Sequence, residues 1–199
     1  MIMHLGLEIT EPELAKMLGS LSPFSVNVVP PGIALYRILE GLHREKPGPI
    51  RIVETGCVRD SNPTSMMSDG WSTFYFAKWV AEHPGSSLAT IDIDQINIDH
   101  CKLFLKRFGL EKNPTFITGD SVETLNSWSH GHIDVLYLDS SDDQNHGLEE
   151  FKAGYYRNPK PKVIIMDDFV SKAAKAVEFA SRHGIPFGSI ERYTFFKPD

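Results

Sequence analysis

The chain has 199 residues, 41% of them apolar and 23% charged, and a net charge of −6. This length suits one domain with a hydrophobic core large enough to fold without disulfides. The acidic balance argues against a long nucleic acid as the main partner, because binding to phosphate backbones depends on lysine and arginine. No apolar run is long enough to predict a membrane span.

The two cysteines, Cys57 and Cys101, do not form a CxxC pair. A disulfide framework and a zinc ribbon are therefore not expected, and a reducing compartment fits this cysteine usage. The N-terminal residues are acidic and lack the basic end and apolar run of a signal peptide. We expect a cytoplasmic protein.

The predicted elements begin with a short helix over 10–18 and an amphipathic helix over 33–44. After residue 50, short apolar runs alternate with helical segments. Strands are predicted over 50–54, 88–93, 115–118, 133–138, 163–166, 187–190 and 193–196. Helices between them are predicted over 71–82, 96–108, 121–128, 147–156 and 171–183.

This alternation predicts βαβ units and therefore an α/β fold with a doubly wound, Rossmann-like sheet. The sheet is expected to have seven strands, mostly parallel, with helices on both faces, because its strands are nearly continuous apolar runs. No helix separates the last two strands, which predicts an antiparallel edge strand at the C-terminal end of the chain.

An acidic residue follows each of the five core strands. These residues are Glu54, Asp92, Asp120, Asp139 and Asp167. In open α/β sheets, ligands bind beyond the carboxyl ends of the strands, where the strand order reverses. We therefore expect the five side chains to meet at one crevice. The alternative for Asp120 and for Asp143 is that they only cap the helices that follow.

The first strand ends in Glu54-Thr55-Gly56, and a glycine there lets the backbone turn tightly beside a ligand. A long segment, 57–69, then precedes Gly70-Trp71-Ser72-Thr73, which opens a helix whose N–H groups can bind a carboxylate. A loop of this length beside a ligand is often a lid, and an ordinary surface insertion is the alternative.

The motifs, taken in order, resemble class I S-adenosylmethionine (AdoMet)-dependent methyltransferases over residues 33–197. The closest likeness is to the small O-methyltransferase-like branch with catechol-type and Methyltransf_24-type proteins. The motifs that carry it are Ile52–Gly56, Thr90–Asp94, Thr118–Ser121, Asp134–Asp139 and Ile165–Phe169. The resemblance implies one methyltransferase domain over 1–199, with an N-terminal helical cap over 1–45 and a core over 50–197.

The resemblance also implies the residues that bind AdoMet. Asp92 is expected at both ribose hydroxyls, and Asp120 or Ser121 at the adenine edge. The cofactor site is completed by Glu54, Gly56, Gly70, Ser72, Thr73 and Asp139. An acidic residue at position 92 would also suit NAD, but an NAD-dependent oxidoreductase would need a compact GxGxxG, which the chain lacks.

A magnesium site is implied by the 28-residue interval between Asp139 and Asp167, which resembles metal-dependent catechol-type enzymes. Asp139, Asp167 and Asp168 are the expected ligands, because three unpaired carboxylates at neighbouring strand ends would repel one another without a cation. The alternative is that Asp139 contacts only the cofactor and that Asp168 caps the next helix.

The lysine that serves as base in catechol-type enzymes falls at Asp142, so that base is absent or replaced. The predicted catalytic residues are Asp139, Asp142 and His146, with Asp143 as a further candidate base. His146 is otherwise a solvated histidine of a polar loop. We interpret His130 and His132 as structural, Trp128 as a core residue rather than an adenine contact, and Glu149 and Glu150 as a solvated helix face.

The expected function is AdoMet-dependent methylation of a hydroxyl on a small molecule or sugar, by in-line attack on the sulfonium with magnesium assistance. A nucleic-acid amino-methyltransferase is disfavoured, because Asp139-Ser140-Ser141-Asp142 is not an Asn/Asp-Pro-Pro-aromatic motif. The alternative is a non-catalytic or differently reactive AdoMet- or nucleotide-binding protein of the same fold, for example one like cephalosporin hydroxylases. No nucleic-acid or membrane partner is expected, and a homodimer through an exposed edge strand or helix 10–18 is left open.

Overall fold

The computed structural model describes residues 32–60, 71–168, 171–190 and 192–198. The predicted helix over 10–18, Gly70 and most of the long loop fall outside these residues. The division into a cap and a core therefore stays a prediction.

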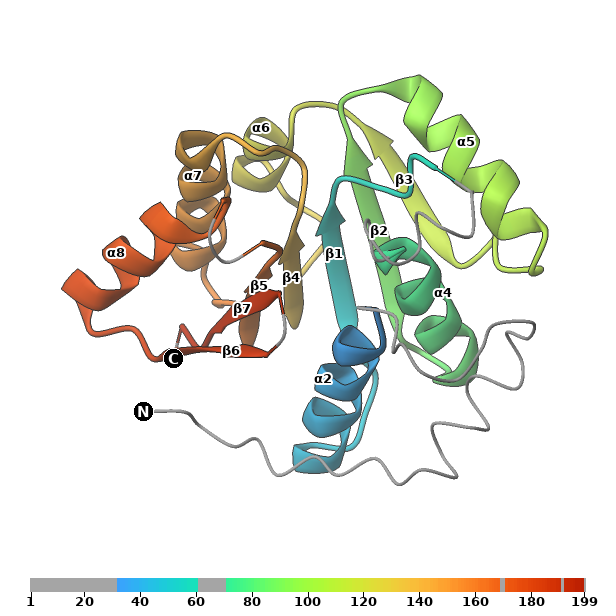
Figure 1. Ribbon diagram of the computed structural model, residues 1–199. Coiled ribbons are helices and arrows are strands. Elements are labelled where there is room, and N and C mark those ends of the chain that lie inside the picture. The colour runs from blue at the N-terminus through green and yellow to red at the C-terminus, as the bar shows by residue number, and fades with distance from the viewer. Residues whose placement is uncertain (1–31, 61–70, 169–170, 191, 199) are drawn as a thin grey trace.

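The described residues form one seven-stranded sheet with the order β3-β2-β1-β4-β5-β7-β6 (Figure 1). The strands are β1 (Arg51–Thr55), β2 (Ser87–Asp92), β3 (Pro114–Thr118), β4 (Val135–Leu138), β5 (Val163–Met166), β6 (Phe187–Ile190) and β7 (Tyr193–Phe196). The first five are parallel, and β7 is antiparallel to both β5 and β6. The predicted fold class is confirmed, and β7 lies inside the sheet with β6 at its edge.

Helices cover both faces of the sheet (Figure 1). One layer consists of α2 (Gly32–Glu45), α4 (Ser72–Glu82) and α5 (Gln95–Lys106), and the other of α6 (Ser121–Asn126), α7 (Gln144–Tyr155) and α8 (Ala174–His183). Successive strand residues therefore enter different cores, as Ile52 and Val53 do on β1. Every residue of β4 and β5 is buried, as expected for central strands covered on both faces.

Two helices begin three residues away from the predicted position, whereas the other described helices begin within one residue of it. α7 begins at Gln144, because the carboxylate of Asp143 accepts the N–H of Asn145 at 2.9 Å and caps the helix. His146 therefore lies in the first turn of α7 and not in a polar loop. α8 begins at Ala174, three residues later than predicted.

None of the helices in the described part of the chain is long and apolar enough to cross a membrane.

Candidate active site

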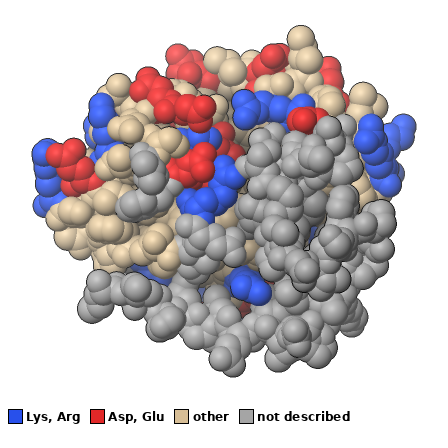
Figure 2. All heavy atoms as spheres, in the orientation of Figure 1, with Lys and Arg blue, Asp and Glu red and all other residues tan. Residues whose placement is uncertain are grey.

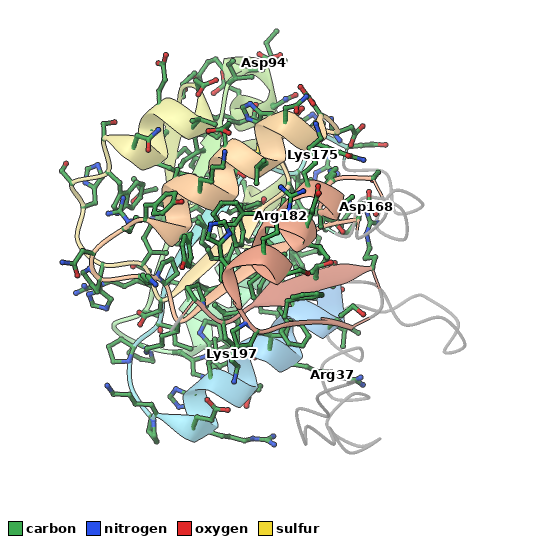
Figure 3. The ribbon with its side chains drawn as sticks, turned by 90° about the vertical axis from the view of Figure 1, so that its left-hand side faces the viewer. Arg37, Asp94, Asp168, Lys175, Arg182 and Lys197 are labelled. Carbon is green, nitrogen blue, oxygen red and sulfur yellow. The ribbon has the colours of Figure 1, made fainter. Side chains whose placement is uncertain are left out.

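The strand order reverses between β1 and β4, since β2 and β3 follow on one side and β5 on the other. A pocket of about 760 Å³ opens at the carboxyl ends of these strands. Figure 3 labels Asp94 and Asp168, which follow β2 and β5, in the upper half of the molecule, and Arg37 and Lys197 in the lower half. In Figure 2, acidic and basic side chains are intermixed in the upper half of the face shown.

The pocket brings together most of the predicted site residues. Those that line it are Gly56, Ser72, Asp92, Asp120, Ser121, Asp139, Asp142, Asp143, His146, Asp167 and Asp168. Glu54 and Thr73 do not line it and are fully buried. Gly70 lies outside the described residues.

Gly56 ends the turn after β1 in a conformation that only glycine adopts readily. Its φ is +79°, and a Cβ at this position would lie 2.6 Å from the backbone oxygen of Asp139. The turn is also tied to the neighbouring strand, because the N–H of Gly56 donates to the carbonyl of Ile91 at 2.8 Å. The absence of a side chain thus lets the turn after β1 pass directly against the end of β4.

Glu54 lies beneath the pocket and links three elements. It accepts hydrogen bonds from the hydroxyl of Ser72 at the start of α4 and from that of Thr90 on β2, the latter at 3.0 Å. Burial raises the pKa of Glu54 to about 7, although the hydrogen bonds from these hydroxyls lower it. Glu54 therefore positions the α4 N-terminus and the ends of β1 and β2.

Asp92 lies at the pocket wall with four donors around its carboxylate. Oδ2 accepts from the backbone N–H and the thiol of Cys57, at 3.2 and 3.4 Å. Oδ1 accepts from the N–H of Asp94 at 2.9 Å and from the side-chain amide of Asn97 at 3.2 Å. These contacts fix the direction of the carboxylate before any ligand binds.

A polar network joins α6 and α7 at the next part of the wall. The Ser121 hydroxyl lies 2.9 Å from His146 Nε2, which is 3.6 Å from Glu150 Oε1. Glu150 is 2% exposed and accepts the hydroxyl of Ser140 at 2.7 Å. The interpretation of Glu150 as a solvated residue is therefore wrong. The contact with Glu150 raises the pKa of the His146 imidazole, and burial opposes this effect.

Asp120 has a clear structural role at the same wall. Its carboxylate accepts the N–H of Glu123 at 2.9 Å and caps α6. The same side chain lines the pocket, so capping and contact with a ligand are both open to it.

The remaining part of the pocket holds the acidic residues that follow β4 and β5, together with two cations. Lys172 Nζ donates to Asp139 Oδ1 and lies 3.4 Å from Asp142 Oδ1. Arg192 donates from Nε to Asp167 Oδ1 at 2.5 Å and from Nη2 to Asp168 Oδ1 at 2.9 Å. These carboxylates are therefore paired, and the Asp168 side chain is not a helix cap.

The charges of this cluster are strongly coupled. Burial raises the pKa of Asp139, and the neighbouring charge of Asp167 raises it further. Burial alone would lower the pKa of Lys172, but the contacts with Asp139 outweigh it and hold that pKa above its ordinary value. Lys172 is consequently an ammonium at neutral pH.

The set Asp139, Asp167 and Asp168 does not fit a magnesium ion as it stands. Each of these carboxylates already has a cationic partner, Lys172 or Arg192, in contact with one of its oxygens. Within the described residues, no group of three or more His, Cys, Asp or Glu side chains is arranged to hold a metal ion. Lys172 and Arg192 thus reduce the repulsion between carboxylates that suggested a divalent cation.

The sequence did not identify Lys172, Arg192 or Asn97 as site residues. No local motif marks them, because Lys172 and Arg192 meet their partners 33 and 25 residues away along the chain. Trp128, His130 and His132 line a separate cavity of about 130 Å³ beside β1–β3, together with Arg51, and none of the three lines the large pocket.

A Rossmann-like sheet with an acidic pocket at its switch point is the arrangement expected of class I AdoMet-dependent methyltransferases. A family described as "Methyltransferase domain" matches residues 67–169, just over half of the chain. The chain belongs to this family and is an AdoMet-dependent methyltransferase.

Solved structures share the fold at low sequence identity. The cofactor-bound Rv0187 from MTB is 15% identical with a TM-score of 0.61, covering 94% of this chain and 90% of its own. An O-methyltransferase from Bacillus cereus in complex with SAH is 16% identical with a TM-score of 0.56, covering 94% and 89%. The O-methyltransferase TomG from Streptomyces achromogenes, involved in tomaymycin synthesis and bound to SAM, is 15% identical with a TM-score of 0.56, covering 96% and 91%. A search of curated proteins found no match.

Proposed function

We propose that this protein transfers the methyl group of AdoMet to a hydroxyl of a small molecule or sugar. The observation that supports the proposal is that one pocket, at the point where the strand order reverses, is lined both by Asp92 and by the charged cluster around Asp139. The names of the similar solved structures, several of them O-methyltransferases, support oxygen as the methylated atom.

The first half of the pocket suits the nucleoside of AdoMet. The preoriented carboxylate of Asp92 can accept ribose hydroxyls as charge-assisted hydrogen bonds, in place of the two side-chain donors, Cys57 and Asn97. Ile93 beside it is 73% exposed and lines the pocket, so it offers an apolar surface to the adenine ring. Asp120 and Ser121 face the same space from α6, and His146 holds the Ser121 hydroxyl in place.

The methionine part fits beside Gly56 and Ser72. Gly56 lines the pocket, and Ser72 lies at the N-terminus of α4, where N–H groups favour a carboxylate. When bound, AdoMet supplies an electrophilic methyl group on sulfur. The protein then has to hold an acceptor hydroxyl in line with that methyl group and accept its proton.

The acceptor is expected in the second half, near Asp139, Asp142 and Lys172. Across the described residues, eight aspartates line the pocket against the cations Arg59, Lys172 and Arg192. This balance favours a neutral or cationic acceptor over a polyanion such as nucleic acid. The proposed reaction uses no magnesium, because Asp139, Asp167 and Asp168 are already paired with Lys172 and Arg192.

Calorimetry with AdoMet and a turnover assay test this proposal. We expect saturable binding of AdoMet and of S-adenosylhomocysteine (AdoHcy), and AdoHcy formation from AdoMet with a hydroxyl acceptor. No binding at millimolar AdoMet would refute the cofactor assignment. Binding without AdoHcy formation across a broad acceptor panel would instead support a binding protein of this fold.

A further inference from the structure

Lys172 is a cation that the fold holds inside the pocket. Lys172 is only 6% exposed, and lysine is rarely buried unless its charge is paired. Its backbone N–H donates to the carbonyl of Asp168 at 2.9 Å, which ties Lys172 to a residue close to the end of β5. Its side chain then reaches Asp139 at the end of β4. The ammonium is thus held near the ends of two neighbouring strands, β4 and β5, and does not belong to a flexible side chain on the surface.

Resting on the proposed O-methyl transfer, we propose that the Lys172 ammonium contacts the acceptor oxygen and supplies the positive charge that a divalent cation would otherwise provide there. The reaction is therefore independent of metal, and Lys172 is a catalytic residue.

The ammonium has the hydrogen-bonding capacity for this role. It carries three N–H donors. Its contacts within the described residues are with Asp139 and Asp142, which leaves one N–H for an acceptor oxygen in the pocket. Its raised pKa keeps the charge in place at neutral pH. A preorganised donor of this kind stabilises the negative charge that grows on the acceptor oxygen as its proton leaves.

The proposed step balances without a further reactant. The acceptor oxygen forms a bond to the methyl carbon while the carbon–sulfur bond breaks, and sulfur keeps the electron pair as the thioether of AdoHcy. The hydroxyl proton passes to the carboxylate of Asp142, whose side chain is 89% exposed and returns the proton to water. Lys172 stays protonated throughout.

Arg192 determines which carboxylates are left to pair with Lys172. Its guanidinium contacts both Asp167 and Asp168 and offsets one of their two negative charges. The ammonium of Lys172 is then shared by Asp139, Asp142 and the acceptor. We assign Arg192 as a positioning residue that acts through this division of charge.

The first test needs no acceptor. The complex of the protein with AdoHcy is titrated with Mn²⁺, and electron paramagnetic resonance measures how much Mn²⁺ is bound. Wild type should bind Mn²⁺ weakly. Lys172→Ala frees the Asp139 carboxylate and should bind Mn²⁺ at least about tenfold more tightly, the scale on which one supporting group changes metal affinity. Lys175→Ala is the matched control, because Lys175 lies three residues further along, in the first turn of α8, contacts Asn145 and does not line the pocket (Figure 3).

Two results of this test would overturn the proposal. One is tight Mn²⁺ binding by wild type that Asp139→Asn abolishes. The other is unchanged Mn²⁺ affinity in Lys172→Ala when its circular dichroism matches that of wild type. If wild type does not bind AdoHcy at all, the proposed function itself is refuted.

The second test measures AdoHcy release with catechol and glucose as hydroxyl probes. Lys172→Met should lower kcat by about 100- to 1000-fold, as expected for loss of one preorganised donor, and leave AdoMet affinity within about twofold. Lys172→Arg should retain more activity than Lys172→Met, because it keeps the charge. Chelator should leave wild-type activity unchanged. Equal kcat for wild type and Lys172→Met, or loss of wild-type activity with chelator, would contradict the proposal.

Discussion

The two halves of the pocket are built by different kinds of contact. In the half around Asp92, backbone N–H groups and short turns set the geometry: Asp92 accepts from Cys57 and Asp94, and Gly56 packs against β4. In the half around Asp139, the geometry comes from ion pairs between side chains that are far apart in sequence, such as Lys172 with Asp139. The geometry of the first half is therefore set by the backbone, whereas the geometry of the second half depends on the balance of side-chain charges.

This difference has a consequence for how each half responds to change. Substitutions in the half around Asp92 should lower stability or AdoMet affinity, because the contacts in this half are part of the fold. Damage to the Asp139 half should appear mainly in catalysis, as the Lys172 variants test. Four further predictions probe the first half, from the largest effect to the smallest.

Gly56→Ala should give the largest loss of stability. The new Cβ would lie 2.6 Å from the carbonyl oxygen of Asp139, and alanine disfavours a φ of +79°. Backbone strain alone costs about 1–3 kcal/mol, and the clash adds to it. Urea unfolding measures the change. Gly119→Ala is the control, because its Cβ would meet only the Thr124 hydroxyl at 3.3 Å. Equal stability of the two variants would contradict the close packing of this turn.

Glu54→Gln should change how stability depends on pH. The pKa of Glu54 is about 7 in the folded protein, above its ordinary 4.5, so the folded state keeps a proton that the unfolded state loses between these values. Ionisation of Glu54 therefore lowers stability as pH rises from 4.5 to 7, by up to about 3 kcal/mol. The glutamine variant lacks this loss. We therefore expect the stability difference between the variant and wild type to shift in favour of the variant as the pH rises from below 5 to above 8. Urea midpoints at these two pH values measure the shift. Parallel pH profiles of the two proteins would rule out a raised pKa for Glu54.

Asp92→Ala should weaken AdoMet binding. Hydrogen bonds to a charged group contribute about 1.5–3 kcal/mol, which corresponds to roughly 10- to 100-fold in affinity. Calorimetry with AdoHcy measures the loss without turnover. Asp99→Ala serves as the control, since Asp99 lies on α5 and contacts Gln95 and Lys102 at the surface. Unchanged affinity in Asp92→Ala would place the ribose elsewhere.

The contrast between the two halves also explains what the sequence could predict. The βαβ pattern and the acidic residue after each strand identified the fold and most of the pocket lining, because parallel strands bring their carboxyl ends to one edge. The pairing of Lys172 with Asp139 depends on where α8 begins, which strand periodicity does not encode. Glu54 shows a further limit: its position in the motif is right, but its side chain turns toward Ser72 and Thr90 rather than into the pocket.

Asp120→Ala gives the smallest effect and decides between two roles. Loss of an N-cap costs about 0.5–2 kcal/mol, so the variant should be slightly less stable in urea. If Asp120 also contacts adenine, as we predict, AdoHcy affinity should fall as well. Asp143→Ala is the matched comparison, because Asp143 caps α7 in the same way and lines the same pocket. A similar stability loss in both variants, with weaker AdoHcy binding only in Asp120→Ala, assigns the adenine contact to Asp120. Unchanged affinity in both would mean that these residues only cap their helices, and the adenine edge would then be left to Ser121.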